Sequence, residues 1–163
     1  MPPGYTLRPA TNADCEAVRA VVLSVLAEYG LQADLSTTDA DLFDLEIHYL
    51  KLGGSFDVVT DTTGHVVASV GLQPQGSGIG ELRKMYLLPQ HRGRGIGRAL
   101  LDHALQRARE LGFSEIHLET ASVLKEATAM YEKAGFEPYQ PEHCAARCDL
   151  AYRLRLLPAT AAS

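Results

Sequence analysis

Hydrophobic and polar positions change their period along the first third of the chain, and each period predicts an element. Residues 5–8 alternate between apolar and polar, as in a half-buried strand. Thr11 and Asp14 have the spacing of a capping box, and apolar positions then recur at helical spacing over residues 15–29. A similar stripe of apolar positions predicts a second helix over residues 36–52.

From residue 56 the pattern changes to strands and then alternates between helices and strands. Valine-rich segments over 56–60 and 65–72 flank a turn and predict a hairpin. Three glycines, Gly76, Gly78 and Gly80, are expected to interrupt the chain before the next strand. The remaining predicted elements are a strand over 81–88, a helix over 96–111, a strand over 115–120, a helix over 125–134 and a strand over 148–156.

The order of these elements is strand, two helices, three strands, helix, strand, helix and strand. Hairpins mixed with strand-helix-strand units predict an α/β (α+β) fold built on a mixed sheet. A chain of 163 residues with 46% hydrophobic content is long enough for one buried core and too short for two ordinary domains. We therefore expect one domain over residues 1–163, with residues 157–163 as a frayed tail.

Composition and charge restrict the class of partner. The net charge of −5 gives no general attraction to nucleic acid or to an anionic membrane, although the segment from Arg83 to Arg98 is locally basic. No apolar run approaches the roughly 18 residues that cross a bilayer. The start of the chain lacks the pattern of a secretory signal, and three cysteines are too few for a disulfide scaffold, so a cytoplasmic protein is expected. A homodimer is left open.

The run Arg92-Gly93-Arg94-Gly95-Ile96-Gly97 lies between a predicted strand and a predicted helix. The first N–H groups of a helix have no backbone partners, and the helix dipole presents positive charge there, so the junction suits an anion. Glycine allows the backbone to approach the ligand closely, and Arg92, Arg94 and Arg98 add positive charge. These residues predict a diphosphate site, and the alternative is a glycine-rich turn that only starts a helix.

Two common nucleotide-binding loops fit this run poorly. A Walker loop needs a lysine followed by serine or threonine, and no such pair occurs in the chain. A dinucleotide-binding loop needs a third glycine where Leu100 stands, and it normally follows the first strand of its unit. The ligand is therefore expected to be another diphosphate.

The run resembles the Gln/Arg-x-x-Gly-x-Gly/Ala loop of GNAT acyltransferases, matched here by Arg92, Gly95 and Gly97. The similarity continues through residues 81–87 and 98–101 and through Ala127-Thr128-Ala129-Met130-Tyr131-Glu132-Lys133-Ala134-Gly135-Phe136. It implies a mostly antiparallel sheet of about six to seven strands flanked by about four helices. It also implies that acetyl-CoA is the cosubstrate, with its pyrophosphate on residues 92–98 and its pantetheine arm beside Met85, Tyr86 and Leu87.

The resemblance further implies two catalytic residues. A primary ammonium has a pKa of about 10 and must lose a proton before it attacks a thioester, so a base or a water chain is needed. Glu81 occupies the position of a glutamate base in several family members, and the alternative is a carboxylate that only pairs with Arg83 or Lys84. Tyr131 matches the tyrosine that protonates the departing thiolate, and the alternative is an aromatic ring packed on its helix.

One position departs from the family pattern. Many relatives place an asparagine seven residues before the tyrosine to bind the pantetheine arm, and Leu124 stands there in this chain. The missing contact is either lost or supplied by a neighbour such as Ser122 or a backbone group.

The acceptor is expected across the strand opening from CoA, and Tyr49, Phe56, Arg83 and Glu119 are candidates to line its pocket. Arg83 would suit a substrate carboxylate. Carboxylates over residues 34–46 either attract a cationic amine or complement the dipole of the predicted second helix.

His143, Cys144 and Cys148 are three potential metal ligands without a fourth, so no metal is expected. No recognition domain for a large partner is visible, which favours N-acetylation of a small-molecule amine or amino acid. The alternatives are acetylation of a protein N-terminus or lysine, and a non-catalytic module that binds acyl-CoA.

Overall fold

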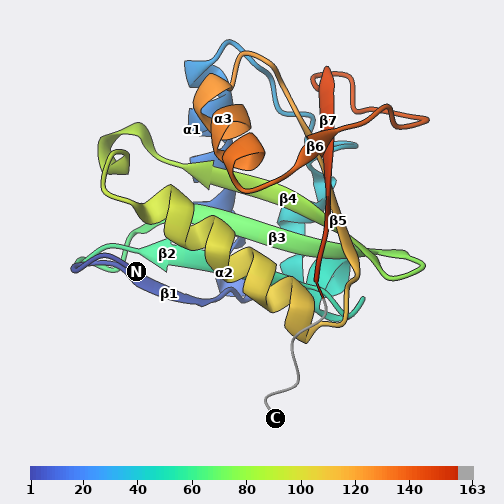
Figure 1. The fold of residues 1–163 in the computed structure, drawn as a ribbon. Coiled ribbons are helices and arrows are strands. Elements are labelled where there is room, and N and C mark those ends of the chain that lie inside the picture. The colour runs from blue at the N-terminus through green and yellow to red at the C-terminus, as the bar shows by residue number, and fades with distance from the viewer. Residues whose placement is uncertain (158–163) are drawn as a thin grey trace.

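A seven-stranded sheet in the order β1-β2-β3-β4-β5-β7-β6 forms the centre of the computed structural model, which describes residues 1–157 (Figure 1). The strands are β1 Thr6–Pro9, β2 Ser55–Thr60, β3 Val66–Gly76, β4 Ile79–Leu87, β5 Glu115–Thr120, β6 Glu137–Pro138 and β7 Leu150–Arg155. Every pairing in the described residues is antiparallel except that of β4 with β5, so the predicted mixed, mostly antiparallel sheet is confirmed. Residues 158–163 of the expected tail lie outside the described residues.

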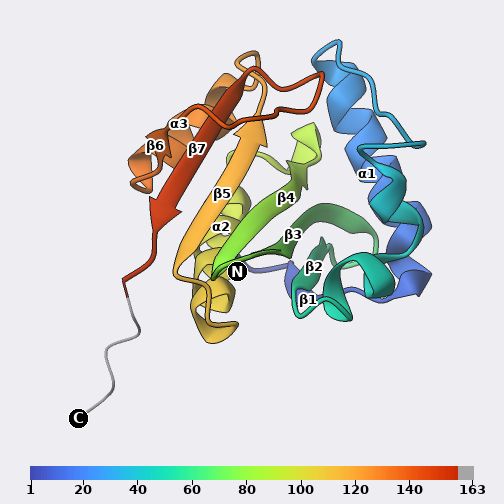
Figure 2. The same cartoon turned by 90° about the vertical axis from the view of Figure 1, so that its right-hand side faces the viewer.

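Helices cover both faces of this sheet. The α-helices are α1 Cys15–Glu28, α2 Ile96–Glu110 and α3 Lys125–Lys133, with a short π-helix at Glu46–Leu50 and 3₁₀ turns at Asn12–Asp14, Ala40–Phe43 and Pro89–His91. Helix α1 lies against one face, and α2 and α3 lie on the other (Figures 1 and 2). Within residues 1–157, no helix combines the length and the apolar character that crossing a membrane requires.

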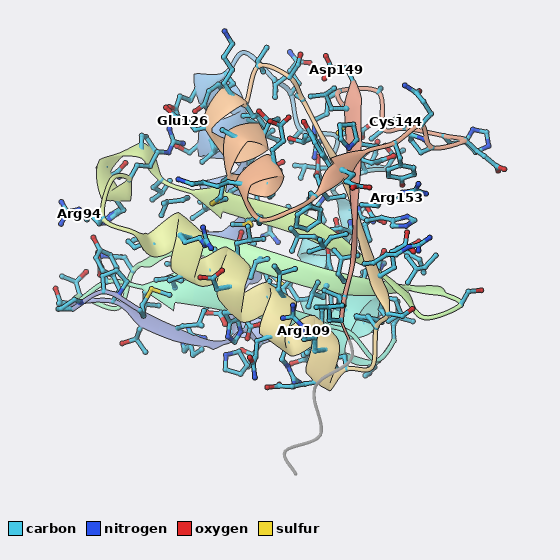
Figure 3. The ribbon with its side chains drawn as sticks, viewed as in Figure 1. Arg94, Arg109, Glu126, Cys144, Asp149 and Arg153 are labelled. Carbon is cyan, nitrogen blue, oxygen red and sulfur yellow. The ribbon has the colours of Figure 1, made fainter. Side chains whose placement is uncertain are left out.

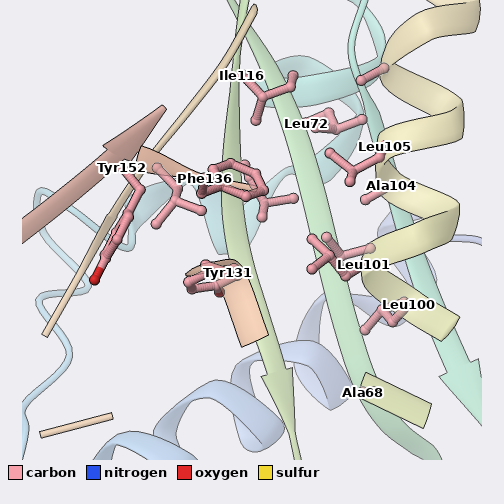
Figure 4. Close-up of a cluster of buried hydrophobic side chains, with 14 of the residues drawn as sticks. Ala68, Leu72, Leu100, Leu101, Ala104, Leu105, Ile116, Tyr131, Phe136 and Tyr152 are labelled. Atoms are coloured by element: carbon pink, nitrogen blue, oxygen red, sulfur yellow. The ribbon is translucent and has the colours of Figure 1, made fainter. Parts of the chain in front are cut away.

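The apolar stripes of the helices form two buried clusters, one on each face. On the α2 face, Leu100 and Leu101 are fully buried and pack with Ile116, Tyr131 and Phe136 (Figure 4). On the α1 face the cluster includes Val18, Val22, Leu45, Tyr49 and Phe56. These two clusters fix α1, α2 and α3 around the sheet and so position the residues predicted to bind the cofactor.

The continuous helix predicted over residues 36–52 is wrong. That segment forms turns, the 3₁₀ turn Ala40–Phe43 and the π-helix Glu46–Leu50. The Asp34 carboxylate accepts hydrogen bonds from the backbone N–H groups of Ser36 at 3.0 Å and Thr37 at 3.2 Å, which offers the backbone an alternative to the helix. Leu52, an expected member of the apolar stripe, is 55% exposed.

Strand β4 begins at Ile79, earlier than predicted, and Gly80 lies within it instead of interrupting the chain. A Cβ atom at Gly80 would lie 2.6 Å from the Phe113 ring, so this position in the strand needs glycine for close packing. Strands β4 and β5 pair only from Ile79 with Glu115 to Glu81 with His117. Beyond Glu81 the two parallel strands are no longer paired, and the sheet opens between them.

Candidate active site

A cavity of about 600 Å³ occupies the opening between β4 and β5. Its wall comes from α1, the end of β4, the loop before α2, the end of β5, α3 and the loop before β7. Most of the predicted site residues line it together: Glu81, Arg83, Met85, Tyr86, Leu87, Arg92, Gly93, Gly95, Ile96, Gly97, Arg98, Glu119 and Tyr131. The structure therefore brings the predicted cofactor and catalytic positions into one cavity.

The glycine loop presents free backbone donors at one end of this cavity. Gly93 and Gly95 have positive φ angles of 74° and 85°, and Gly95 is the N-cap of α2. Within residues 1–157, the backbone N–H groups of residues 93–98 donate no hydrogen bond to another backbone group. Left-handed glycines followed by unpaired helical N–H groups have the geometry that suits an anion, and the diphosphate site stays a prediction.

The three arginines of the loop differ in their surroundings. The Arg92 guanidinium donates to both carboxylate oxygens of Glu28 at 2.7 and 2.9 Å and to the Leu87 carbonyl at 3.0 Å. It therefore ties the loop to α1 and to the end of β4. Arg98 pairs with Asp102 one turn along α2 at 3.0 Å, whereas Arg94 is exposed, lies outside the cavity wall and points away from the loop (Figure 3).

A β-bulge shapes the strand beside the cavity. Ser69 pairs with Tyr86 and Gly71 with Arg83, so Lys84 and Met85 face a single residue of β3. Lys84 adopts a φ of +53°, which is uncommon for a residue with a side chain. The Ser69 hydroxyl donates to the Lys84 carbonyl at 2.7 Å and holds this conformation. A bulge interrupts the ladder, and here it does so in the strand predicted to bind the pantetheine arm.

A buried charge network braces the bulge, and no sequence pattern predicted it. The Lys84 ammonium lies 2.6 Å from the carboxylate of Asp39, which also accepts two hydrogen bonds from Arg147, at 2.6 and 2.8 Å. Burial alone would raise the pKa of Asp39, but the hydrogen bonds from Arg147 and Lys84 outweigh burial and hold that pKa below its usual range. Asp39 therefore stays ionised and joins the bulge to the loop before β7.

The acidic residues over 34–46 were predicted either to attract a cationic amine or to complement a helix dipole, and the structure supports neither interpretation. Asp39 and Asp41 are buried beside Lys84, while Asp34 and Asp44 accept hydrogen bonds from nearby backbone N–H groups. They complement no long helix, because that helix is absent. They also do not form one open surface that would attract an amine.

Glu81 lies at the point where β4 and β5 separate. Burial raises the pKa of its carboxyl above the ordinary value, while the Arg83 charge lowers it and the Glu119 charge raises it again. The Arg83 Nε lies 4.0 Å from the Glu81 carboxylate, whereas the Lys84 ammonium forms its ion pair with Asp39. A half-buried carboxyl with a raised pKa, whose one ion-pair partner in the described residues is 4.0 Å away, is suited to take up a proton.

Tyr131 is both a packed aromatic ring and a cavity residue. Its side chain is 5% exposed, and its ring packs near those of Phe136 and Tyr152, at 5.7 and 6.4 Å between centroids (Figure 4). Burial, followed by the nearby Tyr86, raises the pKa of the Tyr131 phenol well above its usual value. The phenol therefore remains protonated at neutral pH and can act as a proton donor.

The region that replaces the family asparagine is apolar. Leu124 lines the cavity just before α3. The Ser122 hydroxyl donates to Asp149 at 2.6 Å, and Ser122 does not reach the cavity wall. Ser122 is therefore unsuited to replace the missing contact, and the neighbouring backbone stays as the candidate.

Two residues expected to line the acceptor pocket lie elsewhere. Tyr49 and Phe56 are fully buried and pack edge to face, with ring centroids 4.9 Å apart. Neither lines this cavity, and the Tyr49 hydroxyl donates to the buried Asp41. The prediction that they contact the acceptor is wrong, because their apolar positions belong to the core under α1. Arg83 and Glu119 do line the cavity.

In the described part of the chain, no three His, Cys, Asp or Glu side chains are grouped so as to hold a metal ion. Cys148 lines the cavity between β4 and β5, and Cys144 is exposed.

Comparison with known proteins identifies the family. The model of the Acetyltransferase (GNAT) family matches residues 24–136. An uncharacterized N-acetyltransferase of Escherichia coli, YjgM, is 43% identical over 141 residues, which cover 83% of this chain and 84% of that protein. An uncharacterized N-acetyltransferase of Schizosaccharomyces pombe is 27% identical and covers 78% of this chain and 79% of its own length. The chain belongs to the GNAT family of N-acetyltransferases.

Solved structures agree with this assignment at the level of the fold. A GNAT-family acetyltransferase of Staphylococcus aureus superposes with a TM-score of 0.88 at 22% identity and covers 94% of this chain and 99% of its own. A putative acetyltransferase of Salmonella typhimurium, solved with its cofactor acetyl-CoA, has a TM-score of 0.74 at 22% identity and covers 98% of both chains. The sequence-based prediction of a GNAT enzyme is confirmed.

Proposed function

We propose that this chain transfers the acetyl group of acetyl-CoA to the primary amine of a small molecule, by direct attack of the amine in a ternary complex. The observation that carries the proposal is a single cavity that extends from the glycine loop to Glu81 and Tyr131. The free N–H groups of residues 93–98 would hold the pyrophosphate. The bulged end of β4 and the apolar Leu124 and Met130 would hold the pantetheine arm.

The proposed reaction gives each of two side chains a role in proton transfer. Glu81 accepts the proton that the amine loses, and the amine nitrogen then attacks the thioester carbonyl carbon. A backbone N–H group near Met85 stabilises the charge on the carbonyl oxygen, because a donor already aimed at that position needs no reorganisation. The carbon–sulfur bond breaks, and Tyr131 gives its proton to the departing thiolate. The second proton, which the nitrogen loses on becoming an amide, returns through solvent to the Tyr131 phenolate.

A thiol-release assay with acetyl-CoA and a panel of amines tests this proposal. We expect CoA thiol to appear only when an accepted amine is present, together with the N-acetylated product in the mass spectrum. A protein that binds acetyl-CoA in a calorimetric titration and yet releases no thiol with any amine or peptide would be a binding module and not an enzyme.

We expect Glu81→Gln to lower kcat/KM about 10- to 100-fold at neutral pH, with a larger loss at lower pH. The variant depends on amine that is already deprotonated, and this fraction falls about tenfold for each pH unit below the amine pKa. In the unaltered enzyme Glu81 stays ionised until the pH falls through its raised pKa. Below that pH, kcat/KM of the unaltered enzyme and of Glu81→Gln should fall with the same slope.

The measurement is a pH profile of kcat/KM from about pH 6 to 9. Glu137→Gln is the control, because Glu137 is an exposed strand carboxylate outside the cavity wall. A Glu81→Gln profile parallel to that of the unaltered enzyme over the whole range would remove Glu81 as the base.

A further inference from the structure

A second cavity of about 200 Å³ adjoins the cofactor cavity where β4 and β5 separate. Glu81 and Glu119 line both cavities, and His117, Tyr139 and His143 form part of the remaining wall. No lysine or arginine of the described chain lines this second cavity. An acceptor whose amine reaches Glu81 can therefore place its neighbouring group in a space that holds carboxylates and no fixed cation.

The carboxylates around the junction of the two cavities differ in whether they are paired with a cation. The three cations Arg83, Lys84 and Arg147 and the two carboxylates Glu81 and Glu119 line the junction, and Asp39 and Asp41 pair with the cations. A fourth cation, Arg153, lies 5.6 Å from the centroid of the Tyr139 ring and does not line either cavity. Lys84 and Arg147 pair with Asp39, and Arg83 lies 3.8 Å from Asp41 and 4.0 Å from Glu81. In residues 1–157, Glu119 has no cation within ion-pair distance.

Glu119 has only neutral neighbours as hydrogen-bond donors. Its carboxylate accepts from the Ala145 backbone N–H at 3.5 Å and from the Cys144 thiol. The Glu119 charge affects two neighbouring groups. Burial is the larger cause and the Glu119 charge the second: together they raise the pKa of the Cys148 thiol to about 11. The same two causes raise the pKa of the Tyr139 phenol. A ligand cation would remove this imbalance.

Arg83 is poorly placed to bind an acceptor carboxylate. One terminal nitrogen donates to the Gln73 side chain at 3.1 Å and the other to the Thr38 carbonyl at 3.0 Å. A bidentate pair with a ligand would require both donors to leave their present partners. Arg83 also does not line the second cavity.

We infer that the acceptor is an amine of net positive charge, such as a diamine, whose second cationic group lies beside Glu119 in the second cavity. A zwitterionic α-amino acid is disfavoured, because its carboxylate would face Glu119 in a cavity whose described wall holds no lysine or arginine. This inference rests on the proposed function and names the substrate class of the same site.

Matched triplets of acceptors test the inference in the thiol-release assay. One triplet is alanine, alaninamide and 1,2-diaminopropane, and the leucine and phenylalanine triplets are built in the same way to vary size. The values of kcat/KM are calculated with the concentration of unprotonated amine, so that differences in amine pKa do not affect the comparison between acceptors. We expect the diamine to exceed the amino acid by about tenfold or more in each accepted triplet, with the amide between them.

Glu119→Gln should reduce this preference for the diamine about tenfold, whereas Glu137→Gln, which removes an exposed carboxylate outside both cavities, should retain it. Amino acids that react as well as their diamines, or a preference that Glu119→Gln leaves unchanged, would overturn the inference while the acetyltransferase activity stands. The absence of thiol release with every amine would instead refute the proposed function.

Discussion

We expect Gly95→Val to lower the affinity for acetyl-CoA by more than about 100-fold, measured by calorimetric titration. Gly95 has a φ of +85° at the N-cap of α2, where a side chain costs about 1–2 kcal/mol in backbone strain. Relief of this strain would turn the N–H groups of the loop away from the pyrophosphate. Even without relief, the valine methyl groups would lie beside the surface that the phosphates must approach.

Gly112→Val is a closely matched control for that experiment. Gly112 lies at the other end of the same helix with a φ of +84°, and at neither glycine would an added Cβ atom have a heavy atom within 4 Å. Both variants should therefore lose similar thermal stability, while only Gly95→Val should lose acetyl-CoA binding. Affinity retained in a folded Gly95→Val protein would disprove the role of the loop as a phosphate site.

The sequence predicted the elements whose burial has a regular period. Helix α2 buries Ile96, Leu100, Leu101, Leu105 and Ala108, and each of these positions was visible as an apolar residue at helical spacing. The segment over 36–52 has a similar apolar spacing, but the carboxylates of Asp34 and Asp44 accept hydrogen bonds from its backbone N–H groups. Apolar spacing alone cannot reveal this competition, which explains the wrong helix.

In the candidate site, too, some residues could be predicted from a local sequence pattern and others could not. The glycine loop and Tyr131 lie within contiguous motifs, so the sequence alone predicted them. Asp39 and Arg147 are 108 residues apart and meet only because the loop before β7 folds over the bulge in β4. Tyr49 and Phe56 illustrate the opposite error, since an aromatic residue near a predicted pocket is more often part of the core, as both are here.

We expect Tyr131→Phe to lower kcat by about 100-fold or more, with the dissociation constant of acetyl-CoA changed by less than about threefold. Phenylalanine keeps the ring contacts with Phe136 and Tyr152 and removes only the phenol proton that would go to the thiolate. The unaltered phenol has a pKa raised by burial, so it stays protonated across the working pH range. The measurements are kcat from thiol release and the dissociation constant from calorimetry.

Two further variants separate catalysis from packing. Tyr152→Phe removes the hydroxyl of another buried tyrosine, which donates to Glu132 at 2.8 Å and lies outside the cavity wall, so it should affect stability and not kcat. Tyr86→Phe tests the second phenol of the cavity, whose pKa is raised by burial and lowered by the neighbouring Arg147. A normal kcat in Tyr131→Phe with a reduced kcat in Tyr86→Phe would transfer the acid role to Tyr86, because one phenol proton is sufficient for the departing thiolate.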